Sequence, residues 1–379
     1  MQLNPLALAL TSAGMNRYGP DRLFLDGSQG FWLDASDRST LFQDSAGTTP
    51  VTALGDPVGR WLDKSGRGNH AIQNVSANRP FWGRWPESAV IAGFVRNLLI
   101  NTAALSTQSR TVTAVSHTLS FKGTGTVTLS GASTAGPLVG TGAEDFVSLT
   151  FTPSAASLTL TVTGTVQSAQ LEIGSTRTTA QIVGASRAYD VTEAGQPTKY
   201  FLYFNGVNYA MQTASSVDFS ATDEMSVFAG VTKLVDTPSG TIVEHTASSA
   251  SNNGAFALFV PTGVAANSFN YRSRGTVSSD NALASSFTVP TSGVITGLSK
   301  IATDENTARK DGNAVQSVAT NQGSGNYANG ITYFGVATAG TNLWFNGNLY
   351  QLITRGKLTD GALLNSTERF VATKAKGSL

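Results

Sequence analysis

The stretch from Asn97 to Gly184 carries few charges and places Thr on alternate positions, unlike either flank of the chain. Within it, runs at 126–130, 147–152 and 158–163 put apolar side chains on one face and hydroxyls on the other. A period of two is typical of half-buried strands. Glycines between the runs mark turns, so this stretch predicts a small jelly roll.

The two flanks of this stretch resemble each other more than either resembles the middle. Both are rich in aromatic residues and turns, first in 31–73 and again from Tyr200 onward. The length of 379 residues suits two domains. We therefore expect one β-sandwich formed by 21–96 and 185–379, an inserted smaller sandwich at 97–184, and an N-terminal attachment arm at 1–20.

Composition excludes several classes of partner and site. The net charge is +1 and only 13% of residues are charged, so the chain offers no basic surface for nucleic acid. There is no cysteine, which excludes disulfides, zinc ribbons and thiol nucleophiles. The apolar run 5–14 has no basic residue before it and is too short to span a bilayer, so we expect neither a signal peptide nor membrane insertion.

Local signals predict the elements of the larger sandwich. Aromatic or apolar runs at 201–207, 225–231 and 254–260 indicate strands, and the run at 343–353 indicates a closing hairpin or strand. The tight loop 63–69 indicates a hairpin connection, and the Asp-Gly pair at 311–312 indicates a hairpin turn. The segment 359–374 predicts an amphipathic helix, whereas 3–13 fits either a short helix or a strand. The expected fold class is mainly β, with one C-terminal helix and a short N-terminal helix or arm.

A cluster of three aromatics and an arginine precedes the insert: Phe81, Trp82, Arg84 and Trp85. Aromatic faces of this kind stack on the C–H faces of sugar rings, which makes the cluster a candidate glycan contact. The same side chains also suit packing between domains or subunits, and we favour packing. At the N-terminus, Leu6, Leu8 and Leu10 form an apolar group that is a candidate assembly contact.

Metal and catalytic signals are weak. His70, His117 and His245 lie on three separate segments, so a histidine metal site is not expected. Calcium is a weaker expectation, with Asp304, Asp311 and Asn313 as candidate ligands, although ordinary turn capping explains the same residues. No Gly-x-Ser-x-Gly motif occurs, and no serine is paired with a histidine by spacing. We expect no cofactor and no catalytic residue.

Four segments carry a family resemblance: LFQDSAGTTPVTALGDPVGRWLDKSGRGNHAIQ at 41–73, Phe204-Asn205-Gly206, MSVFAG at 225–230, and FNGNLYQLITRGKLTDGALLNSTERFVATK at 345–374. They resemble the concanavalin A-like (laminin-G-like) lectin sandwich found in many phage virion proteins. The middle stretch resembles a carbohydrate-binding-type jelly roll, whose closing strand is matched by AQLEIGST at 169–176. The resemblance implies a protein of the virion surface with sugar-binding ability.

The chain departs from the glucanase relatives of this sandwich. Those enzymes use two glutamates around an aspartate on one strand face, because retaining hydrolysis needs two neighbouring carboxyl groups. No Glu-x-Asp-x-x-Glu run occurs here, and four glutamates stand alone: Glu193, Glu224, Glu244 and Glu305. We therefore expect a protein that is not an enzyme.

The leading hypothesis is a bacteriophage structural protein at the virion surface, in the tail or the capsid. It would be a tail-fibre or receptor-binding subunit that contacts host surface polysaccharide, assembled with other virion proteins and with copies of itself, by resemblance as a homotrimer. One alternative is a capsid decoration or head-spike protein that binds no sugar. Another is a polysaccharide-processing enzyme or its binding module.

Overall fold

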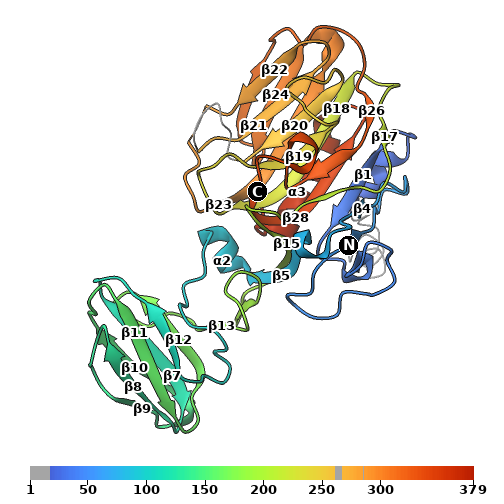
Figure 1. The fold of residues 1–379 in the computed structure, drawn as a ribbon. Coiled ribbons are helices and arrows are strands. Elements are labelled where there is room, and N and C mark those ends of the chain that lie inside the picture. Colours follow the sequence, from blue (N-terminus) through green and yellow to red (C-terminus); the bar gives the residue numbers. More distant parts are fainter. Residues whose placement is uncertain (1–17, 261–266, 285) are drawn as a thin grey trace, which may run out of the picture.

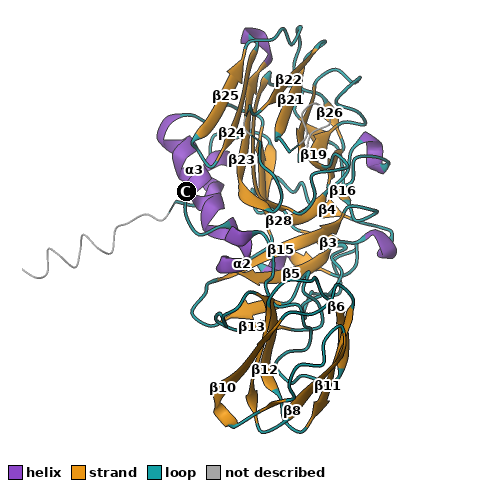
Figure 2. Ribbon diagram, turned by 90° about the vertical axis from the view of Figure 1, so that its left-hand side faces the viewer, coloured by secondary structure: helices purple, strands orange, loops and turns teal. Residues whose placement is uncertain are grey.

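The computed structural model describes residues 18–260, 267–284 and 286–379, and these form two β-sandwiches of unequal size joined by a short linking region (Figure 1). The fold class predicted from the sequence, mainly β with a C-terminal helix, is confirmed (Figure 2). Of the expected N-terminal arm at 1–20, residues 1–17, with Leu6, Leu8 and Leu10, fall outside the described residues. Its last part is described: Tyr18 packs edge to face against Phe370, with ring centroids 6.1 Å apart.

The first sheet of the large sandwich has eight strands. Its β1 strand (Gly30–Asp34) pairs with one end of β28 (Asn346–Arg355), and β15 (Thr198–Asn205) pairs with the other end. In spatial order the strands are β25 (Ala314–Val318), β24 (Glu305–Lys310), β23 (Thr291–Lys300), β18 (Glu224–Lys233), β28 (Asn346–Arg355), β15 (Thr198–Asn205) and β5 (Phe81–Pro86), with β1 (Gly30–Asp34) beside β28.

The second sheet of the large sandwich has nine strands, several of them only two or three residues long. In spatial order they are β2 (Leu41–Phe42), β3 (Arg60–Trp61), β4 (Ala71–Ile72), β16 (Met211–Thr213), β27 (Thr332–Phe334), β19 (Thr241–His245), β20 (Ala255–Phe259), β21 (Asn270–Arg274) and β22 (Ser278–Ala282). The predicted hairpin connection at 63–69 is confirmed, because β3 and β4 pair antiparallel across it.

The main core lies between these two sheets. Phe31 of β1 meets Phe334 of β27 edge to face, with ring centroids 5.4 Å apart. The fully buried Val227 and Leu352 of the first sheet belong to the same apolar cluster as Phe256 of the second. Burial of these alternating apolar side chains is the main force that holds the sheets together.

The outer face of the first sheet is covered by α3 (Gly361–Ala375). Leu364, Val371 and Ala372 of the helix are buried against Phe228 and Ile353 of the sheet. The sequence predicted this helix, and its apolar spacing predicts Leu363, Leu364, Phe370 and Val371 on the inner side; Leu364 and Val371 are buried, and Leu363 and Phe370 are partly buried. Both faces of the first sheet are therefore buried at β15, β18, β23 and β28, whereas Val315 of β25 is 49% exposed.

The small sandwich is built within the predicted insert. Its first sheet is β10 (Gly142–Phe151), β7 (His117–Gly123) and β12 (Gln167–Ile173), and its second is β6 (Gln108–Thr111), β11 (Ser157–Thr163), β8 (Thr126–Gly131) and β9 (Leu138–Val139). Leu119 and Phe121 meet Leu129, Leu158 and other apolar side chains in a core separate from that of the large sandwich.

A linking region joins the sandwiches and contains α2 (Glu87–Ala92) and a two-stranded ladder of β13 (Gln181–Val183) and β14 (Val191–Glu193). The α2 helix was not predicted from the sequence. The other short elements are a ladder of β17 (Val217–Asp218) and β26 (Asn329–Gly330), and the 3-10 turns η1 (Pro20–Phe24), η2 (Arg38–Thr40), η3 (Ser76–Asn78), η4 (Ile301–Thr303) and η5 (Thr338–Gly340).

Candidate functional site

The aromatic cluster before the insert does not offer its tryptophans to a sugar. Trp82 and Trp85 are buried, at 6% and 4% exposed. Trp82 stacks on Tyr200 with centroids 5.2 Å apart, and its Nε1 donates to the carbonyl of Ala35 at 3.0 Å. Trp85 Nε1 donates to the carbonyl of Arg187 at 2.9 Å. Both rings are thus occupied by packing inside the chain, which corrects the glycan-contact hypothesis for them.

The other two members of the cluster also contact the return segment that follows the insert. Arg84 forms an ion pair with Asp190, with 3.0 Å between Nη2 and Oδ1. Phe81 packs edge to face against Tyr189, with centroids 5.8 Å apart, and is half-buried. The cluster on β5 therefore holds the segment 187–190 in place.

The calcium candidates do not converge. Asp304 and Asp311 lie beyond opposite ends of β24. Asp304 Oδ1 accepts a hydrogen bond from the backbone N–H of Gln322, and Asp311 is ion-paired with Lys310 and Lys376 at 2.6 and 3.0 Å. Asn313 lies in the exposed β24–β25 turn. These contacts agree with ordinary turn capping and ion pairing, and calcium binding at either turn stays a prediction.

Acidic and histidine side chains are dispersed. Across residues 18–260, 267–284 and 286–379, no group of three or more His, Asp or Glu side chains is arranged to hold a metal ion. Glu193, at the end of β14, pairs with Arg96 at 2.7 Å. Glu224 and Glu305 lie on either side of Lys300 in one row of the first sheet, and Lys300 bonds Glu224 at 2.9 Å.

The outer face of the second sheet carries two adjoining hollows that share Tyr333, and we call them together the Tyr333 groove. One hollow, of about 590 Å³, has the polar lining residues Thr246, Ser251, Asn252, Asn253, Asn329 and Tyr333. The other, of about 280 Å³, has as its polar and aromatic lining residues Gln73, Asn74, Asn78, Gln212, Tyr333 and Trp344. No residue that lines either hollow is charged.

Strand alternation explains why Tyr333 faces outward. Thr332 and Phe334 are buried on the inner side of β27, so the residue between them points to the outer side. Directly opposite Tyr333 in the ladder lie Gln212 of β16 and Glu244 of β19. Glu244 is buried, so Tyr333 and Gln212 are the members of this row that the groove exposes.

The groove presents uncharged hydrogen-bonding groups. Within the described parts of the chain, the side-chain amides of Asn74, Gln212, Asn253 and Asn329 form no hydrogen bond to other protein groups, so each offers donors and an acceptor to a ligand. Burial, and next the Glu244 carboxylate, raise the pKa of the Tyr333 phenol above its ordinary value. Tyr333 therefore keeps a neutral hydroxyl at neutral pH.

The groove was not predicted from the sequence. Its walls come from 72–78, 210–212, 246–253 and 328–344, which only the pairing of β4, β16, β27 and β19 brings together. The one local signal is the density of Asn, Ser and Thr around a single tyrosine. That signal is equally typical of ordinary loops.

Comparisons with known proteins identify no family. No model of a known protein family matches the sequence, and no curated protein is significantly similar to it. Among solved structures, the CBM40 of Ruminococcus gnavus IT-sialidase bound to α2,3-sialyllactose matches with a TM-score of 0.30 and 7% identity, over 39% of this chain and 83% of that chain. The heptameric SAP-like pentraxin from Limulus polyphemus matches with a TM-score of 0.36 and 10% identity, over 46% of this chain and 82% of that chain.

These TM-scores are too low to carry a functional argument, so the function has to follow from the groove. No helix in the described parts of the chain is long and apolar enough to cross a membrane.

Proposed function

We propose that this protein is a non-enzymatic glycan-binding protein that holds uncharged sugars in the Tyr333 groove. The observation that carries the proposal is the groove's lining, which combines two half-buried aromatics, Tyr333 and Trp344, with amides and hydroxyls and no charge. Aromatic faces pack on the C–H faces of sugar rings, while neutral amides bond to hydroxyls. The two adjoining hollows suit an oligosaccharide rather than a single sugar.

The surroundings of Glu244 and Glu224 support a protein that binds glycans without hydrolysing them. Glycoside hydrolysis uses a pair of carboxyl groups, one of which must stay protonated to act as the acid. Glu244, the acidic residue beneath the groove, is buried and already accepts hydrogen bonds from Ser249 and Thr338. For Glu224, the hydrogen bond from Lys300 lowers the pKa, which keeps that carboxylate ionised. Neither group is placed to act as a general acid.

The biological setting we propose is the surface of a bacteriophage virion, in a tail fibre or another receptor-binding subunit that attaches to host polysaccharide. This part of the proposal rests on the resemblance of 41–73 and 345–374 to lectin-like virion proteins. We also propose assembly as a homotrimer. A decoration protein that binds no sugar is the alternative, and it predicts that the groove stays empty.

The test is a titration of the full chain with neutral oligosaccharides released from bacterial surface polysaccharide, monitored by calorimetry and, for chains that keep Trp344, by the change in total tryptophan fluorescence. We expect Tyr333→Ala and Trp344→Ala each to weaken binding by about tenfold or more. Phe94→Ala, which removes an aromatic that is 52% exposed outside the groove, is the matched control and should bind normally. No binding by the native chain, or equal affinity of all variants, would reject the proposal.

A further inference from the structure

The small sandwich carries a hollow whose chemistry is the opposite of that in the Tyr333 groove. It measures about 490 Å³, within the range of small-molecule sites of about 300–1,000 Å³. Its lining includes two cations, Lys122 and Arg177, one aromatic ring, Phe146, and the small or apolar Ala180 and Ile182. The Tyr333 groove has no charge, so the two sites would select different ligands.

The two cations are held close together by the aromatic ring. Lys122 Nζ lies 5.0 Å from the centroid of Phe146, and the guanidinium carbon of Arg177 lies 4.3 Å from it. The negative face of an aromatic ring attracts cations, which offsets the repulsion between them. Strand alternation sets this arrangement, because Phe121 and Val147 point into the core and leave their neighbours Lys122 and Phe146 on the outer face.

In the parts of the chain that the structure describes, neither Lys122 nor Arg177 forms a salt bridge, although Glu144 and Asp145 lie just before Phe146 on β10. Glu172 is the nearby buried acid, and its oxygens are occupied by the N–H and hydroxyl of Thr178, at 2.8 and 2.6 Å. Positive charge is therefore available to a ligand.

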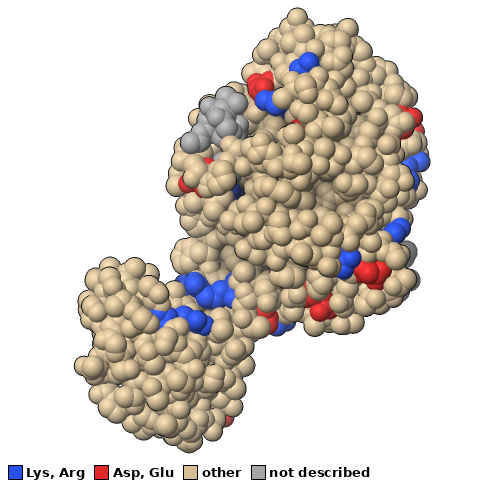
Figure 3. Space-filling view, viewed as in Figure 1, with Lys and Arg blue, Asp and Glu red and all other residues tan. Residues whose placement is uncertain are grey.

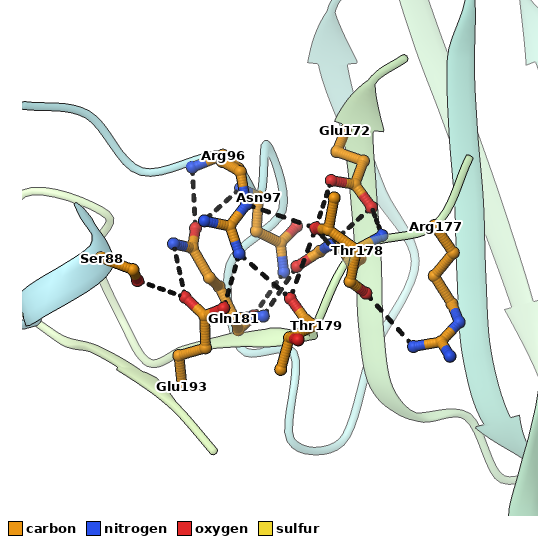
Figure 4. Close-up of polar contacts among 10 residues, drawn as sticks. Ser88, Arg96, Asn97, Glu172, Arg177, Thr178, Thr179, Gln181 and Glu193 are labelled. Atoms are coloured by element: carbon orange, nitrogen blue, oxygen red, sulfur yellow. Dashed lines mark hydrogen bonds and ion pairs between the residues drawn. The ribbon is translucent and has the colours of Figure 1, made fainter. Parts of the chain in front are cut away.

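The segment that carries Arg177 is fixed before any ligand arrives (Figure 4). Thr178, the next residue, is anchored on Glu172. The guanidinium of Arg96 donates to the carbonyl of Thr179 at 3.2 Å and to Glu193 at 2.7 Å, which ties this segment to the linking region. In Figure 3 the Lys and Arg side chains seen between the two lobes stand out from an otherwise largely uncharged face. A preorganised cationic site costs less entropy on binding.

We propose that this hollow binds an acidic sugar, a pyranose that carries a carboxylate. The planar guanidinium of Arg177 and the ammonium of Lys122 suit the carboxylate. The hydroxyls of Ser168 and Thr179 suit sugar hydroxyls, and Ala180 and Ile182 suit its C–H groups. A bare inorganic anion would use the cations alone and leave the rest of the hollow unfilled. The proposal is independent of the Tyr333 groove.

The experiment titrates the full chain with sodium glucuronate, N-acetylneuraminate, glucose and sodium sulfate, each followed by calorimetry and by ligand-observed NMR. We expect the two acidic sugars to bind and glucose and sulfate to bind at least about tenfold more weakly. Arg177→Gln and Lys122→Gln should each weaken acidic-sugar binding by about tenfold. Arg369→Gln, at an exposed arginine on α3, is the matched control and should leave it unchanged.

Several outcomes would overturn the proposal. Sulfate that binds as tightly as glucuronate would show a site for any anion, and glucose that binds equally would show that the cations play no part. Unchanged affinity in both Gln variants would place the acidic sugar elsewhere. Because Lys122 and Arg177 are not in the core, melting curves of the variants should match the native curve, so weaker binding can be assigned to the lost charge.

Discussion

Tyr333 and Glu244 lie directly opposite each other on the neighbouring strands β27 and β19. Glu244 accepts hydrogen bonds from the N–H and hydroxyl of Ser249, at 2.8 and 2.7 Å, and from the N–H of Thr338 at 2.6 Å. Ser249 lies in the loop that borders one hollow of the groove, and Thr338 begins the turn that borders the other. One buried carboxylate therefore fixes both walls around the tyrosine.

The first prediction follows from this arrangement. Glu244→Gln keeps the shape of the side chain but replaces one accepting oxygen with a donor, which leaves a backbone N–H without its acceptor. We expect the unfolding free energy to fall by about 1–3 kcal/mol and glycan affinity to fall with it. Tryptophan fluorescence during urea unfolding measures the unfolding free energy of the large sandwich, because every tryptophan lies outside 97–184. These residues are Trp32, Trp61, Trp82, Trp85 and Trp344.

Glu305→Gln is the control for this change, because the Glu305 side chain is exposed. It should alter neither quantity. Native stability and native affinity in Glu244→Gln would show that the carboxylate does not support the groove.

The second prediction concerns pH. Burial lowers the pKa of His245 to about 4, and the neutral ring is bonded to Thr332 and to the carbonyl of Ala328. The unfolded chain takes up this proton near pH 6.5, whereas the folded chain takes it up only near pH 4. The unfolding free energy should therefore fall as pH drops through this window, by up to about 1.4 kcal/mol per pH unit.

His70, whose pKa burial also lowers, acts in the same direction. The measurement is a series of urea unfolding curves between pH 7 and 4.5, where most carboxylates stay ionised. The His245→Gln variant should show a weaker dependence of the unfolding free energy on pH, whatever the substitution does to stability at pH 7. If the unfolding free energy of His245→Gln depends on pH as strongly as that of the native chain, His245 is not the cause of the pH dependence.

Local sequence patterns predicted the strands, turns and helix whose formation depends on neighbouring residues in the sequence. Alternation predicted β8 and β11, the Asp-Gly pair predicted the turn between β24 and β25, and apolar periodicity predicted α3. The burial of Trp82 and Trp85 could not be predicted from such local patterns. Their burial depends on Tyr200 and on the carbonyl of Arg187, both about a hundred residues away along the chain.

The Tyr333 groove could not be predicted from the sequence either, because segments that are distant along the chain form it. Tyr333 looks like any half-buried strand residue until β16 and β19 are placed beside it. Aromatic residues stood out in the sequence where they cluster, and clustered aromatics bury one another. Tyr333 and Trp344 each precede a phenylalanine that is buried in the core, and they remain half-buried at the surface.

The third prediction is that the insert is independent of the large sandwich. Its core shares no member with the main core, and Asn97 Nδ2 bonds the carbonyl of Gln181 at 2.7 Å, so the two ends of the insert lie side by side. Replacing residues 98–180 with a short Gly-Ser linker should leave a soluble chain that unfolds cooperatively by tryptophan fluorescence. A linker replacement that loses cooperative unfolding would contradict this, and the native chain measured in parallel is the control.

The last prediction is that residues 1–17 are needed for assembly, and that assembly is needed for strong adhesion to host polysaccharide. Residues 1–17 precede the first residues of the core, Leu23 and Phe24, which pack in the α3 cluster. Deleting 1–17 should therefore leave the fold intact while removing the proposed assembly contact of Leu6, Leu8 and Leu10. Light scattering should find a monomer for the truncated chain and an oligomer for the full chain.

Sugar contacts are individually weak, and several copies that engage one surface gain effective concentration. The truncated monomer should thus bind host polysaccharide feebly and the assembly should adhere well. Binding through the uncharged Tyr333 groove should change little between low and moderate salt, because screening acts on charges. Repeating both titrations with Tyr333→Ala tests whether the groove is the adhesive site. Equal avidity of monomer and assembly, or loss of neutral-glycan binding at moderate salt, would show that adhesion works by another route.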